Sequence, residues 1–234
     1  ATIQVTWRDG TRTQVPDVMA NHWIEISQAA STPPKKNVSP TAKAPSLFKH
    51  QPSLLAHRHV DRPFDDMALQ NTLPHKLSEP GPGVSWFDFN GDGWEDLFLS
   101  AGRGGKMGVF RNAGGKQFVR QKASAFAKPV PQDQACILGW QPSATDRALL
   151  IGQTNHEAAR SSASPVRQFS VVTGQSRDDF LNSKTSLGAL TMGDLDADGD
   201  LDLFVGGAHQ AGSYPRPQPS YLLRNQQGTL TADP

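Results

Sequence analysis

The stretch WFDFNGDGWEDLFL at residues 86–99 returns 106 residues later as MGDLDADGDLDLFV, at residues 192–205. Each copy carries acidic or amide side chains at alternate positions, followed by a glycine and then by a short apolar run. The match resumes downstream, where VFRNAGG at residues 109–115 corresponds to LLRNQQG at residues 222–228. Such self-similarity predicts a repeat architecture.

A third, degenerate copy is expected halfway between these two, because 106 residues are too many for one small β unit. Half of that spacing is 53 residues, which places the copy near residue 141. There, ILGW at residues 137–140 precedes a polar segment, and ALLIG at residues 148–152 stands where the apolar run stands in the other copies. We therefore predict that the strands persist in this copy while the acidic side chains are lost.

The composition favours an all-β fold, with 21 Gly, 18 Pro and no long segment of helical period. Repeats of about 40–50 residues that each hold several strands are typical of β-propeller blades. We predict that residues 58–234 form a partial β-propeller of about three four-stranded blades, at residues 83–130, 131–186 and 187–234. A tandem array of small β domains is less favoured, because each unit is too short to bury its own core.

The N-terminal region has a different pattern. Ile3, Val5 and Trp7 alternate with polar residues before a hairpin signal at Asp9-Gly10, and a further strand is predicted at residues 23–26. Residues 1–29 are therefore predicted to form a small β unit. Residues 30–57 are rich in Pro, Ser and Lys and are predicted to be a linker.

The charge balance gives no reason to expect nucleic acid or an anionic membrane as a partner, since 23 basic and 22 acidic side chains leave a net charge of +1. No apolar run is long enough to predict a membrane span. Cys136 is the only cysteine, so an intrachain disulfide is excluded.

The acidic residues are unevenly spread, because nine of the 22 fall within residues 88–96 and 194–202. Such packing of like charge predicts a bound cation.

The two acidic segments have the spacing of calcium loops. Each places side-chain oxygens at loop positions 1, 3, 5 and 9 and a glycine at position 6, which permits a sharp turn. The predicted ligands of two Ca²⁺ sites are the side chains of Asp88, Asn90, Asp92 and Asp96 with the carbonyl of Trp94, and the side chains of Asp194, Asp196, Asp198 and Asp202 with the carbonyl of Asp200. The carboxylates of Glu95 and Asp200 are expected to point to solvent.

Other interpretations of these loops are less favoured. An EF-hand needs a ligand at position 12 and a helix behind it, whereas position 12 is Leu99 or Val205 within a strand-like run. Asp, Asn and Gly could instead form ordinary solvated turns, but two copies with the same spacing argue against this. The middle copy has Gln141, Ser143, Thr145 and Ala148 in ligand places and is not expected to bind calcium.

No catalytic motif accompanies the loops. The chain has no G-x-S-x-G or H-E-x-x-H pattern, so we predict that it is not an enzyme. The histidines of His57-Arg58-His59, near Asp61, lack zinc spacing and are interpreted as part of a solvated segment. Residues 102–106 (GRGGK) lie between predicted strands and are interpreted as a flexible turn rather than a phosphate loop.

The two loops and the strands behind them resemble FG-GAP/VCBS repeats, the calcium-loop blades of integrin-like β-propellers. Residues 64–66, 73–78 and 81–86 resemble the lead-in to the second propeller of bacterial VCBS-repeat proteins with an ASPIC/UnbV domain, and residues 1–28 resemble the end of that domain. This resemblance implies a larger propeller without catalytic chemistry, located outside the cell, on its surface or in the periplasm. Because the chain opens in mid-strand, we interpret it as a fragment and expect a signal peptide upstream.

Two functions from different classes follow. The favoured one is an interaction or adhesion module that presents a rigid surface to a protein or a glycan, including the segment at residues 211–217. The alternative is an accessory domain of a larger secreted enzyme whose catalytic part lies outside this sequence.

Overall fold

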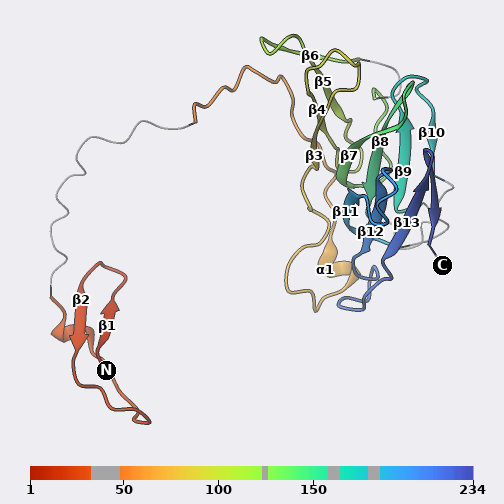
Figure 1. Cartoon of the computed structure of the whole chain (residues 1–234). Helices are drawn as coiled ribbons and strands as arrows, with labels where there is room; N and C mark the ends of the chain where they lie inside the picture. The colour runs from red at the N-terminus through yellow and green to blue at the C-terminus, as the bar shows by residue number, and fades with distance from the viewer. Residues whose placement is uncertain (33–47, 123–125, 158–163, 179–184, 234) are drawn as a thin grey trace. The chain divides into compact units, whose positions relative to one another are not determined.

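A computed structural model describes residues 1–32, 48–122, 126–157, 164–178 and 185–233. The chain divides into two compact units, residues 1–50 and residues 51–234, which are described separately. In both units the regular structure of the described residues is almost all strand, as Figure 1 shows, so the prediction of an all-β fold is confirmed. Residues 33–47 of the predicted linker lie outside the described residues.

The N-terminal unit is a β-hairpin with a short 3₁₀ turn. Strands β1 (Ile3–Thr6) and β2 (Arg12–Val15) pair antiparallel around the predicted turn, where Gly10 adopts a positive φ of 85°. The 3₁₀ turn η1 (Gln28–Ala30) follows. The strand predicted at residues 23–26 is absent, and Trp23 is 96% exposed. That prediction was wrong because the apolar residues there have no second sheet within their unit to pack against.

Within the described residues, the larger unit holds three four-stranded antiparallel sheets and one short helix, α1 (Asp66–Leu69). The first sheet contains β3 (Val84–Phe87), β4 (Asp96–Leu99), β5 (Gly108–Asn112) and β6 (Phe118–Arg120). The middle sheet contains β7 (Gln134–Ser143), β8 (Asp146–Gln153), β9 (Val166–Ser170) and β10 (Ser176–Arg177). The third sheet contains β11 (Leu187–Gly193), β12 (Asp202–Gly207), β13 (Tyr221–Gln226) and β14 (Thr229–Ala232).

Each sheet is a meander in which consecutive strands are neighbours. Equivalent register pairs recur, because Trp86 pairs with Leu97, Gly139 with Leu149, and Met192 with Leu203. The first strands of the sheets lie against one another, with β7 in contact with both β3 and β11. The degenerate middle copy is therefore a sheet of the same topology as its neighbours, as its apolar runs predicted.

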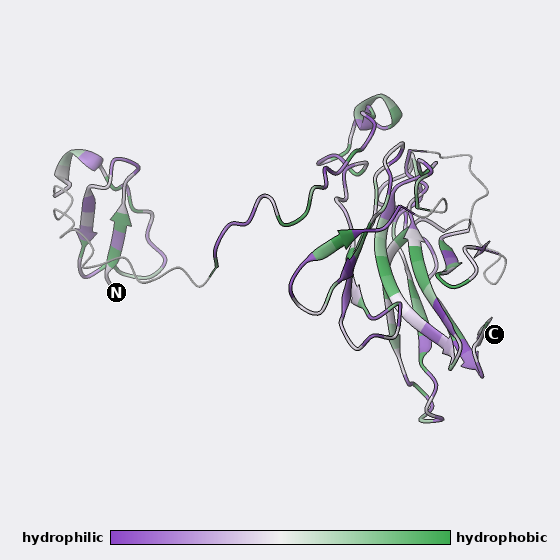
Figure 2. Cartoon of the chain, turned by 90° about the horizontal axis from the view of Figure 1, so that it is seen from above, coloured by the Kyte–Doolittle hydropathy of each residue, from purple (hydrophilic) through white to green (hydrophobic). Residues whose placement is uncertain are grey.

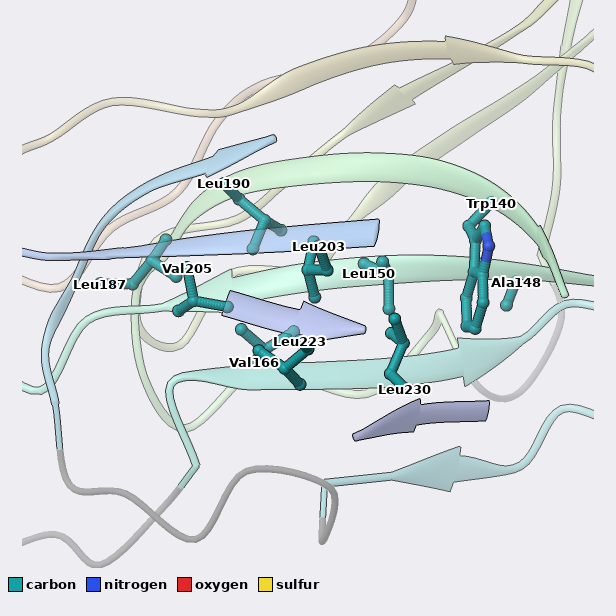
Figure 3. Packing of buried hydrophobic residues seen from close by; sticks show 10 residues of the cluster. All are labelled: Trp140, Ala148, Leu150, Val166, Leu187, Leu190, Leu203, Val205, Leu223 and Leu230. Carbon is teal, nitrogen blue, oxygen red and sulfur yellow. The ribbon is translucent and has the colours of Figure 1, made fainter. Parts of the chain in front are cut away.

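The core fills the two spaces between the three sheets. Along β8 the side chains alternate, so that Leu149 and Ile151 belong to a cluster shared with the first sheet, while Ala148 and Leu150 belong to one shared with the third. Figure 3 shows the second cluster, in which Leu150 lies among side chains of the third sheet. Burial on both faces explains why this strand is continuously apolar. Figure 2 shows hydrophobic residues along the central strands and hydrophilic residues in many of the loops.

The segment of residues 51–80, here called the strap, contacts the first sheet and the segments that follow β8 and β12 of the other two sheets. The ring of His57 packs edge-on against Phe110 of the first sheet, with centroids 6.0 Å apart. Farther along, the ring of Phe64 packs against His156, which follows β8, with centroids 5.9 Å apart. The Gln70 amide then exchanges two hydrogen bonds of 2.8 Å with the backbone of Tyr214, which follows β12. The strap therefore positions the three sheets relative to one another.

Candidate metal centres

The first acidic loop joins β3 to β4 and is folded around Asp88. One carboxylate oxygen of Asp88 accepts hydrogen bonds from the backbone N–H of Gly91 (2.7 Å) and Asp92 (3.1 Å), and the other accepts one from Gly93 (2.8 Å). The side chain of Asn90 accepts from Asp92 N–H, and that of Asp92 accepts from Trp94 N–H. Ligand positions 1, 3 and 5 are thereby drawn to the inside of one tight turn.

The second acidic loop, between β11 and β12, repeats this geometry. The N–H of Gly199 donates to Asp194 (3.2 Å), that of Asp198 to Asp196 (3.4 Å), and that of Asp200 to Asp198 (2.9 Å). Loop positions 4 and 6 have positive φ in both loops. These positions are Gly91 (76°) and Gly93 (84°) in the first loop, and Ala197 (60°) and Gly199 (93°) in the second. The spacing thus encodes one backbone conformation twice, even though position 4 changes from Gly to Ala.

The aspartate at position 9 anchors each loop to its sheet. Asp96 is fully buried and accepts hydrogen bonds from the N–H of Phe89 (3.2 Å) and Asn112 (2.6 Å). Asp202 accepts from the equivalent N–H groups of Leu195 (3.1 Å) and Asn225 (2.9 Å). Each carboxylate therefore ties the start of its loop to its own strand and to the end of the third strand of the sheet.

The loops differ in their electrostatics. Burial raises the pKa of Asp96 despite its backbone hydrogen bonds. At Asp202 the hydrogen bond from Asn225 N–H is the largest influence, and together with the Arg224 guanidinium it lowers the pKa of that carboxyl. Arg224 lies 3.1 Å from Asp202 and 3.3 Å from Asp196. At Asp88 burial opposes ionisation, but the N–H groups of the turn outweigh it and hold the pKa below its usual value.

The second loop brings three carboxylates as close together as a cation site requires, whereas the first loop, all of whose residues are described, shows no such group of three. In the second loop, one oxygen each of Asp194, Asp196 and Asp198 lies within 4.8 Å of the others. In the first loop, the Asn90 amide nitrogen lies 3.0 Å from Asp92, so that positions 3 and 5 are also adjacent. Carboxylate and amide oxygens on a loop with a glycine at position 6 are the donors that Ca²⁺ prefers. Asp96 and Asp202 are not part of such a cluster, and both accept hydrogen bonds from backbone N–H groups.

Two expectations about neighbouring residues are corrected. The Asp200 carboxylate does not simply point to solvent, because it accepts a hydrogen bond of 3.0 Å from Gln227 N–H. The rings of His57 and His59 are partly buried, and both ring nitrogens of His57 are shielded from solvent, so the solvated interpretation of that segment was wrong. The strap had not been predicted as a packed element, and its packing on Phe110 of the first sheet explains the burial of His57. The Trp94 ring, on a loop residue whose carbonyl was predicted as a ligand, packs over Gly115.

Sequence reasoning missed two buried polar clusters near the strap. In the first, His156 lies 2.7 Å from Asp66 on one side and 3.2 Å from His209 on the other. In the second, Asp61, Asp133 and Glu157 bring carboxylate oxygens within 4.8 Å of one another. A signal for the first cluster was available, because His156 and His209 follow strands in equivalent places of the middle and third sheets. Asp61 and Asp133 share no such spacing.

Comparison with protein-family models, with curated proteins and with solved structures found no match for this chain. Among the helices of the described residues, none has the length and apolar character that crossing a bilayer requires.

Proposed function

We propose that this chain is a calcium-binding, non-catalytic part of a β-propeller that acts as an interaction module for a protein or a glycan. The observation that carries the proposal is the equivalence of the two acidic loops, which place the same ligand types in the same hydrogen-bonded turn at the same point of two separate sheets. Turns that only face solvent can form from many sequences, so they would not be expected to share one spacing and one set of hydrogen bonds. Binding of the same ligand by both loops is the simpler explanation of their similarity.

The sheet arrangement supports the propeller. Propeller blades are four-stranded meanders whose first strands gather around a central axis. The three sheets have that topology, with β7 lying between β3 and β11. The outer faces of the first and third sheets carry exposed apolar side chains, namely Trp86 (55%) and Phe204 (39%). Further blades on both sides would bury these faces, which agrees with the resemblance to FG-GAP/VCBS repeats beside an ASPIC/UnbV domain.

Calcium would act by fixing the turns at one end of the sheets. In each loop, the ion would neutralise carboxylates that otherwise repel one another, and it would join positions 1, 3 and 5 to the anchored aspartate at position 9. The loop would then hold one shape without a disulfide, which a chain with a single cysteine cannot form within itself. The resemblance to secreted repeats leads us to propose an extracellular, surface or periplasmic location, where calcium is abundant.

The segment of residues 211–217 supports the interaction role. It projects after β12, yet it is held by hydrogen bonds from Gln210 N–H to Arg216 and from Arg216 N–H to Ser213, both of 2.8 Å. The contacts of Tyr214 with Gln70 fix it to the strap. An ordered projection of this kind keeps the entropic cost of binding low.

Calorimetric titration of the chain with Ca²⁺ tests the proposal. Two loop sites are expected, and Asp92→Ala and Asp198→Ala should each remove one of them while leaving the other. Glu95→Gln is the matched control, because it removes a carboxylate from the same loop at a position that is not a predicted ligand. A glycan array probed with and without calcium then tests the role. If neither alanine variant loses a site, the loops do not bind calcium and the proposal is wrong.

A further inference from the structure

Three carboxylates meet at the end of the sheets opposite to the acidic loops. Asp61 comes from the strap, Asp133 directly precedes β7, and Glu157 lies in the segment that follows β8. One oxygen of each lies within 4.8 Å of the other two. None belongs to the repeat loops, so this cluster is separate from the proposed loop sites.

Asp133 is buried and Asp61 and Glu157 are half-buried as residues, and one oxygen of each carboxylate, here called the inner oxygen, has no partner. Asp133 is 2% exposed and the Glu157 side chain is 4% exposed. Asp133 Oδ2, Glu157 Oε1 and Asp61 Oδ1 are all shielded from solvent and receive no hydrogen bond. Buried carboxylate oxygens are normally satisfied by donors or by a metal, since leaving a buried charge unpaired is costly. The site therefore lacks a positively charged or hydrogen-bonding partner at its centre.

Arg103 supplies only part of the missing charge. Its backbone N–H donates to Asp133 Oδ1 at 2.7 Å, and its guanidinium bonds the outer oxygen of Glu157. The guanidinium also lies over the ring of Phe64, 5.9 Å from the centroid. These contacts occupy the outer oxygens and leave the inner ones free. Three ionised carboxylates and one guanidinium would carry a net charge of −2, which one divalent cation would neutralise.

We propose that Asp61, Asp133 and Glu157 bind a hard divalent cation, with Ca²⁺ the expected ion. An all-carboxylate donor set favours calcium, magnesium or manganese over zinc or copper, which prefer nitrogen and sulfur. Calcium tolerates irregular ligand arrangements and accepts water in the remaining positions, whereas magnesium demands near-ideal octahedral geometry. Burial also raises the pKa of Asp133 and of Glu157, and the neighbouring carboxylates raise both further, which agrees with an uncompensated cluster.

The ion would fasten the strap to the sheets. The turn at residues 102–105 wraps the strap closely, because a Cβ at Gly102 would overlap the Asp61 carboxylate and one at Gly105 would overlap the Val60 carbonyl. The N–H of Arg62 donates to the carbonyl of Arg103 at 3.0 Å. The glycines of the GRGGK motif thus admit the strap and bring Asp61 to Asp133. In this site the motif serves strap packing and cation binding.

A rival arrangement is a proton shared between Asp61 and Asp133, which would neutralise part of the charge without a metal. The two arrangements predict different metal contents. The deciding experiment is equilibrium dialysis of the full chain at pH 7.5 against saturating Ca²⁺, followed by elemental analysis of bound calcium. Wild type is expected to hold three ions, Asp61→Asn two, and the double variant Asp92→Ala/Asp198→Ala one.

Glu79→Gln is the control, because it removes one carboxylate from the same strap at an exposed position paired only with Lys76. It should leave the calcium count unchanged. Asp133→Asn should lower the count as Asp61→Asn does, and circular dichroism reports whether each variant keeps its strands. If Asp61→Asn and folded wild type hold equal amounts of calcium, the proposal is overturned in favour of the shared proton. Failure of the loop proposal is distinguishable, since then Asp92→Ala/Asp198→Ala would lose no ions.

Discussion

The middle sheet and the sheets on either side of it join their first two strands differently. In the first and third sheets an acidic loop, residues 88–95 or 194–201, separates those strands. In the middle sheet, β7 and β8 continue as a hairpin until Ser143 pairs with Asp146. Ala148 is fully buried at the register position that Asp96 and Asp202 occupy in the other sheets.

This difference shows that the acidic loops are not needed to form a sheet of this topology. The middle sheet forms from its apolar strands alone and is covered on both faces by its neighbours. The outer face of the first sheet is covered only in part, by the strap at Phe110, and the outer face of the third sheet leaves Phe204 exposed. The loops therefore add a property, which we infer to be cation binding, to a scaffold that hydrophobic packing already specifies.

The largest effect of a single substitution is expected in the core of the middle sheet. Leu150→Ala should lower the free energy of unfolding by about 2–5 kcal/mol, because it opens a cavity between two sheets. Phe204→Ala, at the equivalent register position of the third sheet, should cost clearly less, because Phe204 is 39% exposed. Urea denaturation followed by circular dichroism measures both. Equal losses would show that the third sheet's outer face is as well packed as the middle sheet.

Apart from the proposed site at Asp61, Asp133 and Glu157, calcium removal should act on the sheets that carry loops. At a free calcium concentration 100 times the dissociation constant, each site stabilises the chain by about 2.7 kcal/mol. A chain of this size should then melt several degrees higher, at about 2–4 °C per kcal/mol. Calorimetry with calcium or with chelator measures the shift. Hydrogen exchange locates it, since amides of the two loops should gain protection while the 144–145 turn of the middle sheet should not.

An intermediate effect is expected where the strap meets the middle sheet. Burial opposes ionisation of Asp66, but hydrogen bonds from Ser78, Leu77 and His156 outweigh it and lower its pKa below the ordinary value of 3.8. Asp66 therefore contributes stability that is present above pH 3.8 and is lost as the pH falls through the lowered pKa. Asp66→Asn should destabilise the chain by about 1–3 kcal/mol at neutral pH.

The same variant should lose less stability than wild type on acidification, because it lacks this carboxyl. Chemical denaturation between pH 3 and pH 7 measures both slopes. Asp65→Asn is the neighbouring control, since Asp65 is exposed and only accepts a helix-capping hydrogen bond from Ala68 N–H. Identical pH slopes for wild type and Asp66→Asn would contradict the assignment.

The smallest effect should distinguish the two loops from each other. Ala197 has a φ of 60°, whereas the equivalent residue of the first loop is Gly91. Ala197→Gly should stabilise the chain by up to about 1 kcal/mol, and Gly91→Ala should destabilise it by a similar amount, because left-handed backbone is strained for a residue with a Cβ. Thermal melts in chelator measure both without metal. A loss of stability in Ala197→Gly would mean that this loop tolerates the conformation for another reason.

Much of the larger unit could be predicted because its signals are local. The apolar runs after each loop, and the run at residues 148–152, became β4, β12 and β8. The turn of each acidic loop was also predictable, since alternate spacing around a glycine dictates one conformation. The strand predicted at residues 23–26 failed because alternation identifies a strand only where a partner strand is available to pair with it.

The buried clusters could not be predicted, because their members are distant along the chain. Asp61 and Glu157 lie almost one hundred residues apart, and each looks like an ordinary loop residue. Only the course of the strap across three sheet ends brings them to Asp133. The interpretation of residues 102–106 was likewise incomplete, since the close approach of Asp61 and Val60 to its glycines is a tertiary contact.

The sequence by itself determined the repeat, the strands and the two acidic loops, because period and spacing act through hydrogen bonds and side-chain alternation between near neighbours. Tertiary structure alone decided which sheet is buried on both faces, where the strap lies, and that three carboxylates share one buried space. Those features depend on how sheets pack, and packing brings together residues whose separation along the chain carries no periodic signal.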